Sequence, residues 1–298
     1  MSAIADSRDQ NEPIQVLFAL HDGFDTLDFT GPLEILSQSQ HDFKDSSTKA
    51  FEITTCAVGN TVKSGQGLSV QADVSFELAH ESLSDYDILI VPGGGVSNIL
   101  KEAGSKADDL PTVKLVDAFT DLQETDPSKE RTLMSVCTGS LFLAQAGVLQ
   151  GLAATTHPDF YTRLEILCAE SARRDMGERT DVMEERYVVN NARYDLGDNP
   201  EENPFIFTKK PEGQGRRKSI ARKGSDAWKA SRRRESIVKR ANMPLGGMRL
   251  ITSGGVTAGM DAALYLVAAL VSHESALEVA RILQFEWKKG VTVQGIDV

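Results

Sequence analysis

The chain has 298 residues, of which 41% are hydrophobic, and a formal net charge of −11 at pH 7. This length allows one large α/β domain or two small ones. The charge argues against nucleic acid as a partner, and no stretch approaches the roughly 20 apolar residues that span a bilayer. The chain has three cysteines, Cys56, Cys137 and Cys168, and their odd number and wide spacing imply neither a disulfide framework nor a zinc site. We therefore expect a soluble, cytoplasmic protein.

Short apolar segments alternate along the chain with segments of helical periodicity. The first buried strand is predicted at 14–20, and Thr30, Gly31 and Pro32 are expected to open a helix. Further strands are predicted at 51–58, 86–91, 132–136, 153–156, 186–192 and 249–252, a hairpin at 59–70, and helices at 111–122, 257–272 and 274–287. This alternation predicts a doubly wound, mostly parallel sheet sandwiched by helices, with ligands beyond the carboxyl ends of the strands.

One domain is expected over 14–290, after a disordered tail at 1–13. A basic, disordered insertion at 199–245 interrupts it, because 209–240 carries 13 Lys or Arg against three acids. Ser219 and Ser236 each follow two arginines and a spacer, a pattern typical of kinase acceptor sites. The insertion is either a phosphorylation-regulated tether or a loop without a role, including an artefact of gene prediction.

Cys137 stands where the apolar segment 132–136 gives way to small residues and then to a helical pattern. A cysteine at such a strand-to-helix turn is exposed at the edge of the sheet and directed over a helix N-terminus, which favours the thiolate. The alternative is a buried structural cysteine. This segment alone leaves both interpretations open.

Two further features fall at predicted carboxyl ends of strands. Gly93, Gly94 and Gly95 follow Pro92, and their backbone N–H groups are candidates for an oxyanion or substrate site. Asp28 lies between apolar neighbours after the first strand, where partial burial would let it donate a proton to the chemistry of a thiol. The alternative for Asp28 is an acid at the N-terminus of a helix. The coincidence of these features with Cys137 favours a catalytic site.

Five segments resemble the ThiJ/PfpI superfamily, which has the class I glutamine amidotransferase-like, flavodoxin-like fold. They are L-D-F-T-G-P, I-V-P-G-G-G, S-V-C-T-G-S-L-F-L-A-Q-A-G-V-L-Q-G, A-T-T-H and L-I-T-S-G-G-V-T-A-G-M-D. The resemblance covers roughly 14–192 and 249–287 in the same order, and within the superfamily it is greatest to the isonitrile hydratase branch.

The resemblance implies a role for four of these residues. Cys137 matches the nucleophile, Asp28 the acid that hydrogen-bonds it, and Gly94 and Thr138 the residues whose N–H groups face it. Relatives of this kind hydrate a small electrophilic isonitrile to a formamide without metal or cofactor, and are commonly homodimers. Addition of the thiol with proton delivery from Asp28 would give a thioimidate, which water then releases.

The pocket departs from that resemblance at Pro158, where the hydratases carry an aromatic residue. His157 is therefore an alternative base for Cys137, with Asp159 orienting it, or else a helix cap. Glu34 is a second, less favoured candidate for the acid. Cys56 and Cys168 are expected in the core, and His21 in a loop or lining the pocket.

Three functions compete on these residues. The first is an isonitrile hydratase-like lyase, and the second is a glyoxalase or deglycase that acts on 2-oxoaldehydes. The third is a redox sensor or chaperone in which Cys137 is oxidised, because accessible thiols of low pKa oxidise readily. A transcription factor is not expected, because only about a dozen residues follow the last predicted helix.

Overall fold

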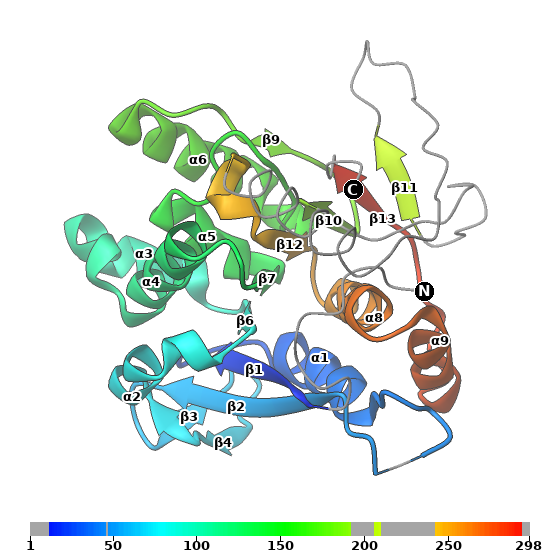
Figure 1. Ribbon diagram of the computed structural model, residues 1–298. Helices are drawn as coiled ribbons and strands as arrows, with labels where there is room; N and C mark the ends of the chain where they lie inside the picture. Colours follow the sequence, from blue (N-terminus) through cyan, green and yellow to red (C-terminus); the bar gives the residue numbers. More distant parts are fainter. Residues whose placement is uncertain (1–11, 46, 192–205, 210–241, 294–298) are drawn as a thin grey trace.

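A nine-stranded sheet formed by the described residues runs through the computed structural model (Figure 1). The structure describes residues 12–45, 47–191, 206–209 and 242–293. Across the sheet the order is β11 (Ile206–Lys209), β13 (Gly290–Val293), β10 (Tyr187–Asn190), β12 (Arg249–Ser253), β7 (Thr132–Val136), β6 (Ile88–Val91), β1 (Ile14–Ala19), β2 (Phe51–Ala57) and β5 (Val74–Ser75). Neighbouring strands are parallel except β10 and β12. The predicted, mostly parallel sheet is confirmed.

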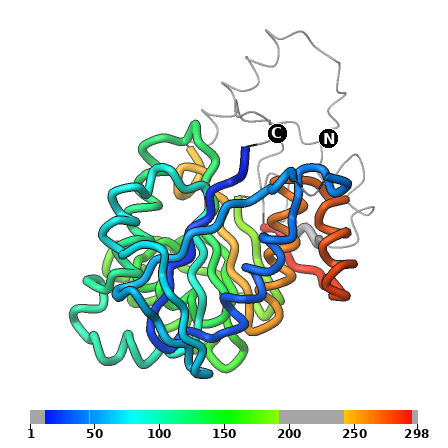
Figure 2. Tube along the Cα trace, turned by 90° about the horizontal axis from the view of Figure 1, so that it is seen from below, coloured from blue at the N-terminus to red at the C-terminus, as the bar shows by residue number. Residues whose placement is uncertain are grey.

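Helices cover both faces of this sheet, as Figures 1 and 2 show. One face carries α1 (Thr26–Gln38), α8 (Ala258–Leu270) and α9 (His273–Ile282). The other carries α2 (Phe76–Glu81), α3 (Val96–Ala103), α4 (Pro111–Thr125), α5 (Ser140–Ala146) and α6 (Tyr161–Asp175). Alternate residues of a strand face opposite layers, so Phe18 joins the first core and Leu17 the second.

Smaller elements complete the description. The predicted hairpin is the antiparallel pair β3 (Thr61–Lys63) and β4 (Ser69–Gln71). The strand expected at 153–156 is only β8 (Ala153–Ala154), which pairs with β9 (Asp181–Val182) outside the main sheet. Short 3-10 turns are η1 (Leu83–Asp85), η2 (Gly104–Asp109), η3 (Cys137–Gly139), η4 (Pro158–Phe160) and η6 (Pro244–Gly247).

The order of the strands determines where a ligand site can lie. The chain leaves β1 for β2 on one side, whereas β6 and then β7 extend the sheet on the other side. Such a reversal opens a crevice at the carboxyl ends of the strands, where doubly wound proteins bind ligands. Asp28 follows β1, Gly93 follows β6 and Cys137 follows β7, so all three lie beyond the carboxyl ends of neighbouring strands.

Two predicted boundaries were wrong. Helix α1 begins at Thr26 and not at Thr30, because Asp25 caps it, and Pro32 lies inside the helix, where it has no N–H to donate. Asp28 therefore lies in the first helical turn, as its alternative interpretation predicted. The last helix ends at Ile282, and the chain continues into β13.

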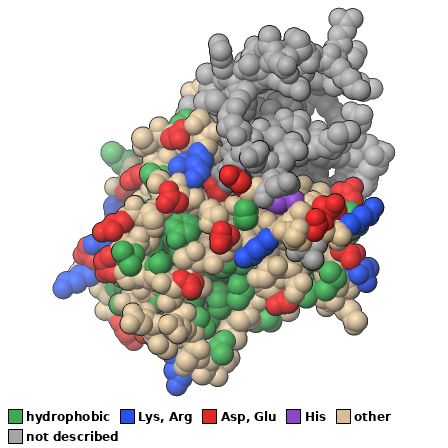
Figure 3. Space-filling view, turned by 60° about the horizontal axis from the view of Figure 1, so that its bottom comes forward, with side chains coloured by type: hydrophobic (Ala, Val, Ile, Leu, Met, Phe, Trp, Pro, Cys, Tyr) green, Lys and Arg blue, Asp and Glu red, His purple; other side chains and the backbone are tan. Residues whose placement is uncertain are grey.

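The segment expected to be a disordered insertion, 199–245, contributes β11, which pairs with β13 in parallel register. Residues 206–209 therefore belong to the sheet. The remainder of the basic segment, 210–241, with Ser219 and Ser236, lies outside the described residues, as does 1–11 of the expected tail. On the face shown in Figure 3, acidic side chains are spread among basic ones and do not form a single patch. None of the described helices is long and apolar enough to cross a membrane.

Candidate active site

Cys137 occupies a sharp turn between β7 and α5, and its backbone is in the left-handed region, with φ of 57°. A residue with a side chain adopts this conformation only where its surroundings hold it there. The carbonyl oxygen of Cys137 accepts hydrogen bonds from Ser140 Oγ (3.1 Å) and Thr156 Oγ1 (3.0 Å). A Cβ at Gly139 would collide with the Val91 carbonyl oxygen, so the turn packs directly onto β6. The predicted strand-to-helix turn is confirmed.

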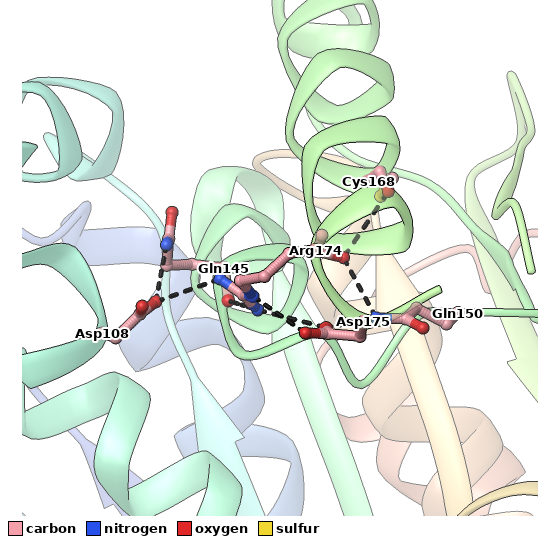
Figure 4. Close-up of polar contacts among 7 residues, drawn as sticks. Asp108, Gln145, Gln150, Cys168, Arg174 and Asp175 are labelled. Atoms are coloured by element: carbon pink, nitrogen blue, oxygen red, sulfur yellow. Dashed lines mark hydrogen bonds and ion pairs between the residues drawn. The ribbon is translucent and has the colours of Figure 1, made fainter. Parts of the chain in front are cut away.

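The far end of α5 is fastened to its neighbours by polar contacts (Figure 4). Gln145 Nε2 donates to Asp108 Oδ1 (2.8 Å), and Arg174 Nη1 reaches the same oxygen (3.3 Å). Arg174 also donates to the Gln145 carbonyl oxygen (3.2 Å), while Gln150 Nε2 donates to Asp175 Oδ2 (2.7 Å). These exposed contacts add little stability singly, but together they link α5 with α6 and η2.

Asp28 is fully buried in the first turn of α1. Its Oδ2 accepts the N–H of Gly93 (3.2 Å), and its carboxyl group hydrogen-bonds the thiol of Cys137. Burial, and to a lesser degree the negative charge of Asp25, raises the pKa of Asp28 to about 7 against the opposing effect of these two hydrogen bonds. Oδ1 is buried and receives no N–H or O–H hydrogen bond from the described residues. This oxygen is the one left to carry a proton.

The thiol of Cys137 is also buried, with 7% of the residue exposed. Burial raises its pKa, and so does the negative charge of Asp28, while a hydrogen bond from the Thr138 N–H acts in the opposite direction. The expectation of a thiol that ionises below its ordinary range is therefore wrong. Desolvation and a neighbouring carboxylate outweigh the helix N-terminus. The resting cysteine is a thiol, and Asp28 is the first group of the pair to lose its proton.

The glycine loop does not offer free N–H groups. Gly93 donates to Asp28, Gly94 to Thr138 Oγ1 (2.9 Å) and Gly95 to the Gly23 carbonyl oxygen (3.1 Å). The Thr138 hydroxyl donates in turn to the Gly94 carbonyl oxygen (3.0 Å). The expected oxyanion site on these glycines is therefore corrected: their role in this structure is to hold Asp28 and Thr138. A Cβ at Gly93 would lie 2.6 Å from the Thr138 nitrogen, which explains the glycine there.

His157 lies beside the nucleophile but forms no hydrogen bond to it among the described residues. Its Nδ1 accepts the N–H of Asp159 (3.2 Å) and caps η4, as the alternative interpretation predicted. The ring edge at Cδ2 and the sulfur of Cys137 border the same point: a Cβ on Gly255 would lie 2.8 Å from the former and 2.6 Å from the latter. Both groups therefore border the space left by the missing side chain of Gly255.

The remaining candidates have other partners. Glu34 is exposed, and its carboxylate accepts a hydrogen bond from Gln38, so it does not meet the thiol. His21 is buried against Phe142, and burial lowers its pKa to about 4. Cys56 and Cys168 are buried core residues, as expected. Within the described ranges no cluster of three His, Cys, Asp or Glu could hold a metal ion.

Four residues of the site were not singled out from the sequence. Ser140 and Thr156 hold the Cys137 carbonyl oxygen by hydrogen bonds, and Gly255 leaves space beside the thiol because it has no side chain. Asp25 caps α1 with Oδ1, which accepts the N–H groups of Leu27 (3.0 Å) and Asp28 (3.4 Å). Only Asp25 left a usable signal, because an Asp three residues before another helical acid is a common start of a helix.

This protein has a doubly wound sheet and a buried cysteine at a strand-to-helix turn, and the cysteine faces a carboxyl group that follows the first strand. These features define a class of α/β proteins in which the cysteine is a candidate nucleophile. A model of the DJ-1/PfpI family matches residues 14–192. The chain belongs to this family, which is the ThiJ/PfpI group that the sequence motifs resemble.

Two relatives match about half of the chain. An uncharacterized protein in the cpoL 5′ region of Streptomyces lividans is 29% identical over 145 residues, which are 49% of this chain and 88% of that protein. An isonitrile hydratase of Pseudomonas putida is 29% identical over 156 residues, 52% of this chain and 58% of the hydratase. The match therefore spans little more than half of the hydratase.

Solved structures share the fold. A ThiJ/PfpI family protein from Pseudomonas syringae has a TM-score of 0.56 at 19% identity, and the match covers 95% of this chain and 82% of the Pseudomonas syringae chain. The DJ-1 protein of Schizosaccharomyces pombe has a TM-score of 0.52 at 17% identity, covering 92% and 100%. At these identities the similarity confirms the flavodoxin-like architecture alone.

Proposed function

We propose that this protein is a cofactor-independent hydratase that converts an isonitrile to an N-substituted formamide with Cys137 as nucleophile. The observation that carries the proposal is the buried pair of Asp28 and Cys137. A carboxyl group with a pKa of about 7 exchanges protons readily near neutral pH, as a general acid and base must. The similarity to an isonitrile hydratase of Pseudomonas putida supports the substrate class.

The first step forms a thioimidate. Asp28, as carboxylate, takes the thiol proton while the sulfur bonds to the terminal carbon of the isonitrile, and it then passes that proton to the same carbon. The carbon gains one C–S and one C–H bond, and Asp28 returns to the carboxylate. The N–H of Thr138, which hydrogen-bonds the sulfur, keeps it oriented during the addition.

The second step uses the same carboxylate. Asp28 takes a proton from water as the oxygen attacks the thioimidate carbon, and delivers it to the nitrogen. Collapse of this adduct breaks the C–S bond, and the hydroxyl proton returns to the sulfur. One acid–base group serves both steps, so the reaction does not require His157, whose Nδ1 is occupied by Asp159.

The alternatives fit this geometry less well. A redox sensor depends on a thiolate, whereas burial and the charge of Asp28 keep Cys137 protonated. Attack on a 2-oxoaldehyde develops charge on oxygen, and the N–H groups of the glycine loop that would stabilise it are already bonded. Glyoxalase or deglycase activity therefore remains the second candidate, on the same thiol. Homodimeric assembly and a cytoplasmic location stay predictions.

A substrate panel with matched variants tests the proposal. Purified protein is offered an alkyl isonitrile and methylglyoxal, and formamide and lactate are quantified. We expect formamide from the wild type and from Cys168→Ser, whose altered thiol is buried in the core beneath α6, and none from Cys137→Ser. Lactate without formamide would replace the proposal with the second candidate. No turnover, with rapid oxidation of Cys137, would replace it with the sensor.

A further inference from the structure

Asp25 is a second carboxylate of the site, held in place by the backbone. Its side chain caps α1 and accepts the N–H of Asp28 itself (3.4 Å). Its own N–H donates to the carbonyl oxygen of Gly93 (2.9 Å), whose N–H in turn donates to Asp28 Oδ2 (3.2 Å). Both acids are thus fastened to the same glycine. The backbone of Asp25 and the carboxylate of Asp28 are therefore anchored at one point, which keeps the two acids close together.

The β3–β4 hairpin fixes the orientation of the Asp25 carboxylate. Gln66, in the loop of this hairpin, accepts hydrogen bonds from Thr26 N (2.9 Å) and Thr26 Oγ1 (2.9 Å) at Oε1. Because Oε1 accepts these hydrogen bonds, the other end of the Gln66 amide is its NH2 group. This group, at Nε2, donates to Asp25 Oδ2 (2.7 Å). The adjacent Gly65 N–H donates to the Phe24 carbonyl oxygen (2.8 Å). Hydrogen bonds therefore fix the hairpin to the turn that carries Asp25.

Few other charges face Asp28 from the elements around it. On α8, Asp261 is bonded to Arg186, and the Lys63 residue of the hairpin is exposed. His157 lies across Gly255, and the glycine loop carries no ionisable side chain. Besides the thiol of Cys137, the negative charge of Asp25 is therefore the main charge that Asp28 meets. This charge is the second-largest cause of the raised pKa of Asp28, after burial, and the smallest cause of the raised pKa of Cys137.

We propose that Asp25, oriented by Gln66, is a positioning residue that biases the proton shared by Asp28 and Cys137 toward Asp28. A fixed negative charge disfavours a second negative charge on the nearer group more than on the farther one. Transfer of the thiol proton to Asp28, which begins the proposed reaction, becomes easier as a result. The inference rests on the proposed role of Asp28, but it concerns a protonation equilibrium that exists without substrate.

The direct test is the titration of Asp28 in the full-length protein without substrate, followed by ¹³C NMR of aspartate carboxyl groups. The Asp28 signal is assigned by its loss in Asp28→Asn. In Asp25→Asn, which keeps a capping side chain, we expect the midpoint of Asp28 to fall by roughly one pH unit. Asp25→Glu should restore most of the shift. Asp22→Asn is the matched control, because Asp22 belongs to the same loop and, in the described part of the chain, accepts a hydrogen bond from the Lys63 N–H and none from Asp28.

An unchanged midpoint in Asp25→Asn, or an equal shift in Asp22→Asn, would overturn the proposal. Gln66→Ala gives a second route if Asp25→Asn fails to fold, and it should lower the midpoint in the same direction by a smaller amount; no change there would also count against the proposal. Turnover gives the independent readout. If isonitrile is hydrated, Asp25→Asn should lower kcat with little change in KM and move the rising limb of the pH profile to lower pH. A protein that shows the shift but hydrates no isonitrile would refute the proposed function alone.

Discussion

The carboxyl group of Asp28 and the thiol of Cys137 share a buried contact in which each alters the protonation of the other. The carboxylate charge raises the pKa of the thiol, whereas the hydrogen bond with the thiol lowers the pKa of Asp28. Asp28 still titrates near neutrality, at about 7, because its burial dominates. The pair therefore holds one proton above that pH, on sulfur at rest and on Asp28 during attack.

Removal of the Asp28 charge should separate thiol reactivity from turnover. In Asp28→Asn the thiol loses the carboxylate that raises its pKa, so alkylation of Cys137 by iodoacetamide at pH 8 should accelerate several-fold. Formamide production should fall by at least roughly a hundredfold, because the general acid is gone. Peptide mass spectrometry and product quantification measure the two rates. Glu34→Gln, exposed on the same helix, is the control; parallel loss of both rates would contradict the pairing.

The rate of isonitrile hydration should rise with pH through about 7 and then level off. Below this pH both groups are protonated and Asp28 cannot accept the thiol proton. Above it the carboxylate accepts that proton, and the thiol itself stays protonated because its pKa is raised. Initial rates from pH 5.5 to 9 measure the profile. A rate that is flat or falls over this range would be inconsistent with Asp28 as the proton acceptor.

Gly255 should tolerate no side chain. A Cβ there would lie 2.6 Å from the Cys137 sulfur and 2.8 Å from His157 Cδ2, so Gly255→Ala should abolish turnover and slow alkylation of the thiol. Gly254→Ala is a close control, since its nearest neighbour, the Thr156 carbonyl oxygen, would lie at 3.4 Å. Equal activity of the two variants would show that the space beside the thiol is not limiting.

His21 should be a stability cost that grows in acid. Both ring nitrogens are buried without a hydrogen-bond partner in the described residues, and burial lowers its pKa from 6.5 to about 4. Because the folded state resists protonation, the free energy of unfolding is unaffected by His21 titration above pH 6.5 and decreases as pH falls from 6.5 toward 4.

His21→Leu should therefore stabilise the fold by roughly 1–3 kcal/mol at pH 8, through removal of unsatisfied polar atoms. The gain should be roughly 2 kcal/mol larger at pH 5. Chemical denaturation at the two pH values measures it, with exposed His80→Leu as the control. A destabilised variant whose deficit is independent of pH would show that His21 has partners in solution.

The sequence predicted the parts of the fold that periodicity and small residues encode. The strands at β1, β2, β6 and β7 and the turn at Cys137 were predicted, because buried parallel strands are continuous apolar segments bounded by turn residues. Strand β13 was missed, since Gly290 to Val293 pairs with segments distant in sequence. The start of α1 was misplaced because Pro32 resembled a first turn, whereas the cap of Asp25 decides the boundary.

The site was predicted in its residues but not in its electrostatics. Cys137, Asp28 and Thr138 do lie together, yet a lowered thiol pKa and free glycine N–H groups were expected and neither is present. Both errors have one cause. Sequence position indicates which groups meet at a strand end, whereas desolvation and the partner of each N–H depend on how tightly the surrounding chain packs.

Formation of a covalent adduct on Cys137 is the most direct test of the central claim. The wild type is mixed with an alkyl isonitrile, quenched within milliseconds, reduced with borohydride to trap the thioimidate, and mapped by peptide mass spectrometry. We expect an adduct with the mass of the isonitrile plus the two hydrogens of reduction on Cys137 alone, with formamide in solution. Formamide without an adduct on Cys137, or no adduct and no formamide, would contradict it.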